Sequence, residues 1–161
     1  MLLYLMQHGA SFSKDIDPEE PLSPLGRESV ERSCRAMAAL SVRPELILAS
    51  PKLRSRQTAA LVAKALNYPE TAIVVTESVK AMASPGLILE DLAKNPPASV
   101  LIAGHLPHVA KLAAKVCTSG GAGDFVVENS GLTLVQVTNF APLTGKLLWH
   151  APPQVLHLVG A

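Results

Sequence analysis

Leu2-Leu3-Tyr4-Leu5-Met6-Gln7-His8-Gly9 is an apolar run of strand length that ends abruptly in a histidine and a glycine. An unbroken apolar run of this length is typical of a strand buried on both faces, as in a parallel sheet. In an open α/β sheet, ligands bind just beyond the carboxyl ends of the strands. His8 is therefore well placed for chemistry, and Gly9 allows a ligand close to the backbone. On this run alone, a plain loop at His8 is an equally good interpretation.

Short apolar runs alternate with helical patterns along the rest of the chain. Strands are expected at residues 46–49, 72–75, 100–103, 132–138 and 146–149, the last two joined by a turn near Pro142 and Gly145. Helices are expected after Ser23-Pro24, Ser50-Pro51 and Ser84-Pro85, as N-cap and proline pairs, and around 109–116. This alternation predicts an α/β fold, a three-layer sandwich whose mostly parallel central sheet has helices on both faces.

The composition is that of one globular domain of 161 residues, because apolar residues make up 48% of the chain. The formal net charge of +1 is too small to favour nucleic acid or an acidic membrane as the main partner. We expect a cytoplasmic protein, since no signal peptide or transmembrane run is found. Cys34 and Cys117 fall within helical patterns and are expected to be buried free thiols.

Polar residues follow three of the expected strands, at Gln7-His8, in the segment 50–58 and at Gly104-His105. A parallel sheet would bring these three strand ends to one edge. Arg54, about one turn into its helix, can reach back to that edge, where free backbone N–H groups and the helix dipole attract anions. Its forked guanidinium suits phosphate, although a solvated helix charge is the plainer interpretation.

Two histidines beside a phosphate site suggest phosphoryl transfer. One histidine can accept the phosphoryl group on a ring nitrogen, and the other can stabilise charge on that group. A single histidine at a strand end would more often be structural. Because His8 and His105 are expected at the same edge as Arg54, we favour the catalytic interpretation.

In combination, these motifs resemble those of the histidine phosphatase superfamily. The shared features are the His-Gly strand end at 8–9, the Ser-Pro-x-x-Arg-x-x-Gln-Thr pattern at 50–58 and the Gly-His strand end at 104–105. The Pro-Leu-Ser-x-x-Gly segment at 21–26 and the short chain are more similar to the SixA-type phosphohistidine phosphatases. The resemblance runs from Leu2 to about Val116.

This resemblance implies that residues 1–161 form a single histidine phosphatase domain with a phosphoglycerate mutase-like fold. It implies that His8 is the phosphoryl-accepting nucleophile and that Arg54 and His105 bind the phosphoryl oxygens. Glu77 follows the expected third strand, where larger relatives keep a proton donor. The implied catalytic residues are His8, His105 and Glu77, and the implied phosphate-binding residues are Gln7, Gly9 and Arg54.

The chain departs from the family pattern at two positions. Gln7 stands where the family usually has arginine, and a neutral hydrogen bond contributes about 1 kcal/mol against roughly 1.5–3 kcal/mol for a charge-assisted one. This replacement alone would weaken phosphate binding about tenfold. Glu20 also stands where SixA-type members have arginine, and we expect its loop to turn it outward, since a carboxylate would repel phosphate. Lys14 or Lys52 could restore some positive charge.

The expected function is removal of phosphoryl groups through a phosphohistidine intermediate, with phosphohistidine in a protein as the leading substrate. Imidazole is a good leaving group once protonated, so a P–N bond needs less acid catalysis than a phosphate ester. A small-molecule phosphomonoesterase, which would need a proton donor such as Glu77, remains open. So does a weak or inactive module that binds phosphate or phosphoproteins.

No cofactor, metal, nucleic acid or membrane is expected as a partner. His105-x-x-His108 has the spacing of a zinc pair, but no further cluster completes a ligand set. His108 is expected at the surface or rim near the start of its helix. Asn129 and Ser130 could line the pocket, although surface turn residues look the same in sequence.

Overall fold

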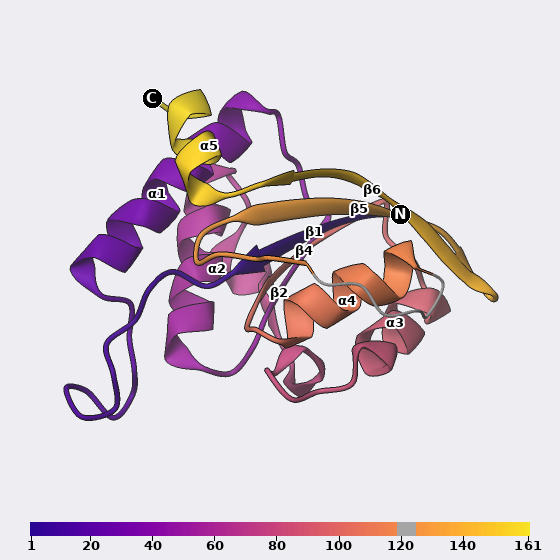
Figure 1. Ribbon diagram of the computed structural model, residues 1–161, viewed down its shortest axis with the longest axis horizontal. Helices are drawn as coiled ribbons and strands as arrows, with labels where there is room; N and C mark the ends of the chain where they lie inside the picture. The colour runs from indigo at the N-terminus through magenta and orange to yellow at the C-terminus, as the bar shows by residue number, and fades with distance from the viewer. Residues whose placement is uncertain (119–124) are drawn as a thin grey trace.

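The computed structural model describes residues 1–118 and 125–161, which form one central sheet with helices on both sides (Figure 1). The strands are β1 (Leu2–Gln7), β2 (Leu46–Ala49), β3 (Val74–Val75), β4 (Ser99–Gly104), β5 (Leu132–Phe140) and β6 (Leu143–Ala151). The α-helices are α1 (Pro24–Ala39), α2 (Leu53–Ala65), α3 (Pro85–Lys94), α4 (His108–Cys117) and α5 (Pro153–Val159). Two short 3₁₀ helices, η1 (Glu70–Ala72) and η2 (Glu77–Val79), flank β3.

The strands lie in the order β3-β2-β4-β1-β5-β6. The first four are parallel to one another, β5 is antiparallel to β1, and β6 is antiparallel to β5, so the predicted mostly parallel sheet is confirmed. The register of β1 and β4 pairs Leu2 with Ser99 and Gln7 with Gly104. His8 and His105 therefore leave the sheet at the same level on adjacent strands, which is the relationship that builds the site.

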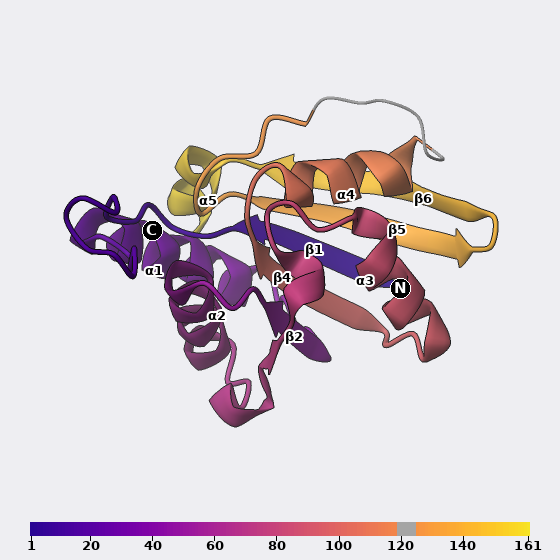
Figure 2. The same ribbon diagram turned by 90° about the horizontal axis from the view of Figure 1, so that it is seen from below.

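Helices α1, α2 and α5 pack on one face of the sheet, and α3 and α4 pack on the other (Figure 2). Alternate residues of β1 serve the two layers, since Tyr4 and Met6 belong to one core cluster and Leu3 and Leu5 to the other. This period of two is that of a strand buried on both faces, and it makes the unbroken apolar run necessary. The predicted three-layer sandwich is confirmed.

Two of the three predicted serine caps are confirmed. The Ser23 hydroxyl accepts a 3.1 Å hydrogen bond from the Gly26 N–H, and Ser84 caps α3 in the same way at 3.3 Å. The third prediction is wrong, because Lys52 and not Ser50 is the N-cap of α2. Ser50 instead accepts from the Lys52 N–H in a tight turn at 3.4 Å. Helix α2 thus begins at Leu53, and Arg54 is its second residue.

Three further details differ from the sequence predictions. The strand expected at 72–75 is only Val74–Val75, because residues 70–72 form η1 and this edge strand has a partner on one side alone. The turn between β5 and β6 lies at 141–142, and Gly145 lies within β6. Helix α5 was not predicted, since its seven residues are too few for a clear period.

Both cysteines are free, with Cys34 buried and Cys117 partly exposed. Within the described residues, no helix combines the length and the apolar character needed to cross a membrane.

Candidate active site

The two histidines at the strand ends lie against each other. Their ring centroids are 4.8 Å apart and their planes are inclined at 64°, an edge-to-face contact. The backbone N–H of His8 donates to the carbonyl of Gly104 at 3.0 Å, which extends the β1–β4 pairing by one bond. Both side chains are nearly buried, with 9% of His8 and 3% of His105 exposed.

The hydrogen bonds of His8 indicate where its ring proton lies. Nδ1 is 2.7 Å from the carbonyl oxygen of Gly9, and a carbonyl can only accept, so Nδ1 carries the proton. The Nε of Arg54 donates to Nε2 of His8 at 3.0 Å, which requires a lone pair on Nε2. Burial lowers the pKa of His8, while the Gly9 carbonyl raises it in part. The ring is a neutral imidazole with a lone pair on Nε2, the form that a nucleophile needs.

Arg54 is held in place by the first turn of α2. The Ser55 hydroxyl accepts from the Ser50 N–H at 2.9 Å and donates to the Ala103 carbonyl at 2.6 Å, which links the ends of β2 and β4 to the helix. The Arg54 side chain is 16% exposed, and its Nη1 lies 3.2 Å from a carboxylate oxygen of Glu20. A guanidinium at this position faces the histidines directly.

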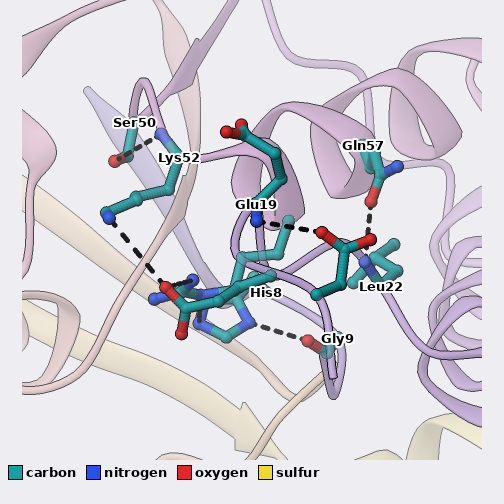
Figure 3. A network of polar contacts seen from close by, with 10 residues as sticks. His8, Gly9, Glu19, Leu22, Ser50, Lys52 and Gln57 are labelled. Carbon is teal, nitrogen blue, oxygen red and sulfur yellow. Dashed lines mark hydrogen bonds and ion pairs between the residues drawn. The ribbon is translucent and has the colours of Figure 1, made fainter. Parts of the chain in front are cut away.

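Two residues of the 50–58 motif have structural roles that sequence reasoning left unassigned. Thr58 accepts from the Gly9 N–H at 3.2 Å and donates to the Arg54 carbonyl at 2.8 Å. The Gln57 carbonyl oxygen accepts from the Leu22 N–H at 2.7 Å (Figure 3). Both side chains tie the loops after β1 to α2. Their place in the Gln-Thr pair that ends the motif is the signal that could have identified them.

His105 is kept uncharged by its surroundings. Burial, with His8, Arg54 and Lys52 nearby, lowers the pKa of His105 to about 3. Its Nε2 is buried and has no hydrogen-bond partner among the described residues. An imidazole of this kind can donate one N–H to an oxyanion.

The other predicted phosphate ligands differ in what they can offer. The side-chain oxygen of Gln7 is buried and has no hydrogen-bond partner among the described residues, and the NH2 of the same amide is the group that can donate to phosphate. By contrast, the Gly9 N–H is bound to Thr58 and its carbonyl to His8. A Cβ on Gly9 would lie 2.7 Å from the Gly26 carbonyl oxygen, so glycine is needed there for packing against α1. Gly9 thus acts on the site by orienting His8.

The segment before β5 closes the site from the other side of β1. Asn129 donates its side-chain amide to the His8 carbonyl at 2.7 Å, and the Ser130 N–H donates to the Gln7 carbonyl at 3.0 Å. Ser130 has a left-handed backbone with φ of 66° and a buried hydroxyl that has no hydrogen-bond partner in the part of the chain that the structure describes. The suggestion that these two residues lie at the pocket agrees with their contacts.

The expectation for Glu20 is wrong, because its side chain turns inward. It lies against Arg54 at 3.2 Å and within 4.0 Å of the Lys52 ammonium, and it is only 17% exposed. Its backbone φ of 50° lies in the left-handed region, a conformation that the sequence pattern does not predict for glutamate.

Glu77 lies at the edge of this arrangement. It is in η2, its side chain is 71% exposed, and its carboxylate is paired with Lys80. Lys80 lines a cavity of about 180 Å³ together with Lys52, Arg54 and His105. A larger hollow of about 380 Å³ is lined by other residues and includes none of the candidate site residues.

The expectation that His108 lies at the surface or rim is wrong. Its side chain is fully buried at the start of α4. Burial lowers its pKa. Among the described residues, no group of three or more His, Cys, Asp or Glu side chains could hold a metal ion.

Comparison with known proteins adds to this geometry. Residues 3–82 match the model of the histidine phosphatase superfamily (branch 1). The chain is 33% identical over 121 residues to the phosphohistidine phosphatase SixA of Escherichia coli (strain K12), covering 73% of this chain and 74% of that protein.

Solved structures share the whole fold. A structure of the protein histidine phosphatase SixA complexed with tungstate has a TM-score of 0.85 and 26% identity, covering 96% of this chain and 98% of that one. A mycobacterial glucosyl-3-phosphoglycerate phosphatase complexed with VO3 has a TM-score of 0.69 and 16% identity, covering 93% and 99%. At that identity the second likeness concerns the fold alone.

Proposed function

The chain belongs to the histidine phosphatase superfamily, and on that basis we propose that it removes phosphoryl groups from phosphohistidine in a protein through an intermediate on His8. We also propose that residues 1–161 form one such domain, since Leu156 near the end of the chain shares a core cluster with Tyr4 of β1.

The observation that carries this proposal is the pair of contacts that orients the His8 ring. With Nδ1 held by the Gly9 carbonyl and Nε2 facing Arg54, the Nε2 lone pair points toward the anion-binding group. In the first step, the Arg54 Nε–H leaves Nε2 and turns to a phosphoryl oxygen, and the freed lone pair of Nε2 forms a bond to phosphorus while the P–N bond of the substrate breaks. The electron pair of that bond stays on the departing imidazole nitrogen.

The proton balance favours a phosphohistidine substrate. A phosphohistidine protonated on its second nitrogen releases neutral imidazole, so no separate proton donor is needed. Phospho-His8 has the same form, because Nδ1 keeps its proton against Gly9. Water can then attack phosphorus and release phosphate and neutral His8. The first step exchanges one phosphohistidine for another, so its two sides have similar energies.

Charge on the phosphoryl group would be stabilised by Arg54 and His105. Arg54 is the cation nearest to Nε2 of His8, and a charge-assisted hydrogen bond contributes roughly 1.5–3 kcal/mol. His105 is neutral because its pKa is lowered to about 3, and it can donate a ring N–H to a phosphoryl oxygen. A third contact could come from the side-chain NH2 of Gln7, which can donate to a phosphoryl oxygen.

The position of Glu77 supports a P–N over a P–O substrate. An ester needs a positioned acid to protonate its leaving oxygen. Glu77 is mostly exposed and is paired with Lys80, so it is not held ready for that task. A small-molecule phosphomonoesterase is therefore the weaker interpretation.

The test is intact-mass spectrometry after brief mixing with phosphoramidate and quenching at alkaline pH, which preserves phosphohistidine. We expect a single phosphoryl adduct on the wild type that decays as phosphate appears, and none on His8→Ala. His150→Ala removes a histidine of β6 that is hydrogen-bonded to Thr133 of β5, and this variant should form the adduct normally. An adduct that persists in His8→Ala, or a wild type that neither forms an adduct nor releases phosphate, would contradict the proposal.

A further inference from the structure

The anion-binding arginine of this site already holds an anion from its own chain. One carboxylate oxygen of Glu20 lies 3.2 Å from Nη1 of Arg54, and Nε of the same guanidinium donates to His8 at 3.0 Å. Neighbouring nitrogens of one planar group thus bind the candidate nucleophile and a carboxylate. The Glu20 charge also acts on His8 itself, where it raises the pKa against the larger effect of burial, so a phosphoryl group bound at Nε2 lies within its influence.

The loop that carries Glu20 fixes this inward direction. The Glu20 N–H donates to the Asp17 carbonyl at 2.9 Å. In the two residues that follow, the Pro21 carbonyl accepts from the Phe12 N–H and the Leu22 N–H donates to Gln57. These bonds enforce the left-handed φ of 50° at Glu20. A non-glycine residue keeps such a conformation only where its surroundings over-determine it, and such residues cluster at functional sites.

The charges around Glu20 determine how its carboxylate affects a bound phosphoryl group. Lys52 and Arg54 are the cations in contact with it, at 4.0 and 3.2 Å. The pKa values of His8 and His105 are both lowered, so neither ring offers a compensating positive charge. An incoming phosphoryl group competes with Glu20 for Arg54 and meets its negative charge. Lys52 is half-exposed and lies beside the same carboxylate oxygen, so it can keep Glu20 paired when Arg54 turns to the phosphoryl group.

We infer that Glu20 determines specificity, by favouring phosphoryl groups attached to a cationic leaving group over those without a cation. The protonated ring of phosphohistidine brings a positive charge and an N–H next to phosphorus. The Glu20 carboxylate can attract the charge and accept a hydrogen bond from the N–H. The phosphate ester of an uncharged alcohol brings negative charge alone and is repelled. This inference rests on the proposed phosphohistidine chemistry, and it gives the glutamate at this position a purpose.

Stable phosphonates can test the inference without turnover. Methylphosphonate has no cation, whereas aminomethylphosphonate carries an ammonium group next to phosphorus. Binding of each is measured by calorimetry to the wild type, to Glu20→Gln and to Glu20→Asn. Asparagine carries no charge and tolerates a left-handed backbone, so it is a second variant should the glutamine disturb folding. Glu19→Gln, an exposed neighbour on the same loop, is the matched control.

We expect Glu20→Gln to bind methylphosphonate about tenfold more tightly, because one nearby like charge is removed. The affinity of Glu20→Gln for aminomethylphosphonate should equal that of the wild type or be lower. The ratio of the affinity for aminomethylphosphonate to that for methylphosphonate should therefore fall about tenfold or more in this variant. Because variants are compared, differences in ionisation between the two ligands cancel. Glu19→Gln should keep the wild-type ratio.

An unchanged ratio in both Glu20 variants would overturn the inference, as would an equal shift in Glu19→Gln. These outcomes are independent of the proposed function. If the wild type forms no phosphoryl adduct, the enzyme proposal fails, yet the ratio of the two affinities still decides whether Glu20 selects for a cation.

Discussion

The carbonyl oxygen of Gly9 lies 2.7 Å from Nδ1 of His8, and this contact between neighbours determines which ring nitrogen is available. The backbone of Gly9 is held in turn by Thr58, whose hydroxyl accepts from the Gly9 N–H and donates to the Arg54 carbonyl. The nucleophile candidate and the anion-binding arginine are therefore positioned by one connected set of hydrogen bonds.

Thr58→Val tests this connection. Valine has nearly the same shape but leaves the buried Gly9 N–H without a partner, so we expect a loss of about 1–3 kcal/mol in the free energy of unfolding. Phosphoryl adduct formation on His8 should also slow. Urea unfolding measures the first effect. Thr138→Val, at an exposed position of β5, should change the free energy by less, and equal losses in both variants would contradict the role of Thr58.

Gly9→Ala tests the packing of the first strand end. The added Cβ would lie 2.7 Å from the Gly26 carbonyl oxygen and from a methyl of Val30, so we expect a destabilisation of about 1–3 kcal/mol. Gly86→Ala is the matched control, since its Cβ would meet nothing closer than 3.5 Å. In a helix that change should stabilise by roughly 0.5–1 kcal/mol. Opposite signs in thermal unfolding are the expected result, and a stabilised Gly9→Ala would refute it.

The pH dependence of stability should reflect His105. Its pKa in the folded protein is about 3, below the ordinary 6.5, so the unfolded chain takes up the proton first as the pH falls. Stability from this group is complete above pH 6.5 and is lost progressively below it. Between pH 7 and pH 4.5 the loss is roughly 2–3 kcal/mol. Unfolding at both pH values should show a smaller drop for His105→Gln than for the wild type, and an equal drop would contradict the assignment.

Gln7→Arg should strengthen phosphate binding. Gln7 lies at the end of β1, and arginine there would replace the neutral contact that the Gln7 NH2 can donate with a charge-assisted one. We expect inorganic phosphate to bind about tenfold more tightly by calorimetry. Gln154→Arg adds the same charge in α5 and should leave the affinity unchanged. A similar gain in both variants would indicate a general charge effect.

The two lysines considered from the sequence should behave differently. Lys52 lines the cavity next to Arg54 and His105, whereas Lys14 is exposed on the loop after β1. Lys52→Ala is expected to weaken phosphate binding several-fold, on the order of one exposed charge interaction. Lys14→Ala should have no effect on the same titration. Equal affinities in the wild type and Lys52→Ala would remove Lys52 from the site.

Much of the fold was readable from local patterns. The apolar run at Leu2–Gln7 and the caps at Ser23 and Ser84 depend on interactions within a few residues, so they could be predicted without the fold. The pairing of His8 with His105 also followed, because parallel strands end at one edge and each histidine directly follows its strand.

The direction of Glu20, the burial of His108 and the true start of α2 could not be read in this way. Each depends in part on contacts between segments far apart in the chain. Glu20 turns inward because bonds from Gln57 and Asp17 fix the backbone around it, and its partner Arg54 lies on α2. Periodicity and caps report local preferences, whereas the charge facing the phosphoryl group is set by how a loop folds back onto a distant helix.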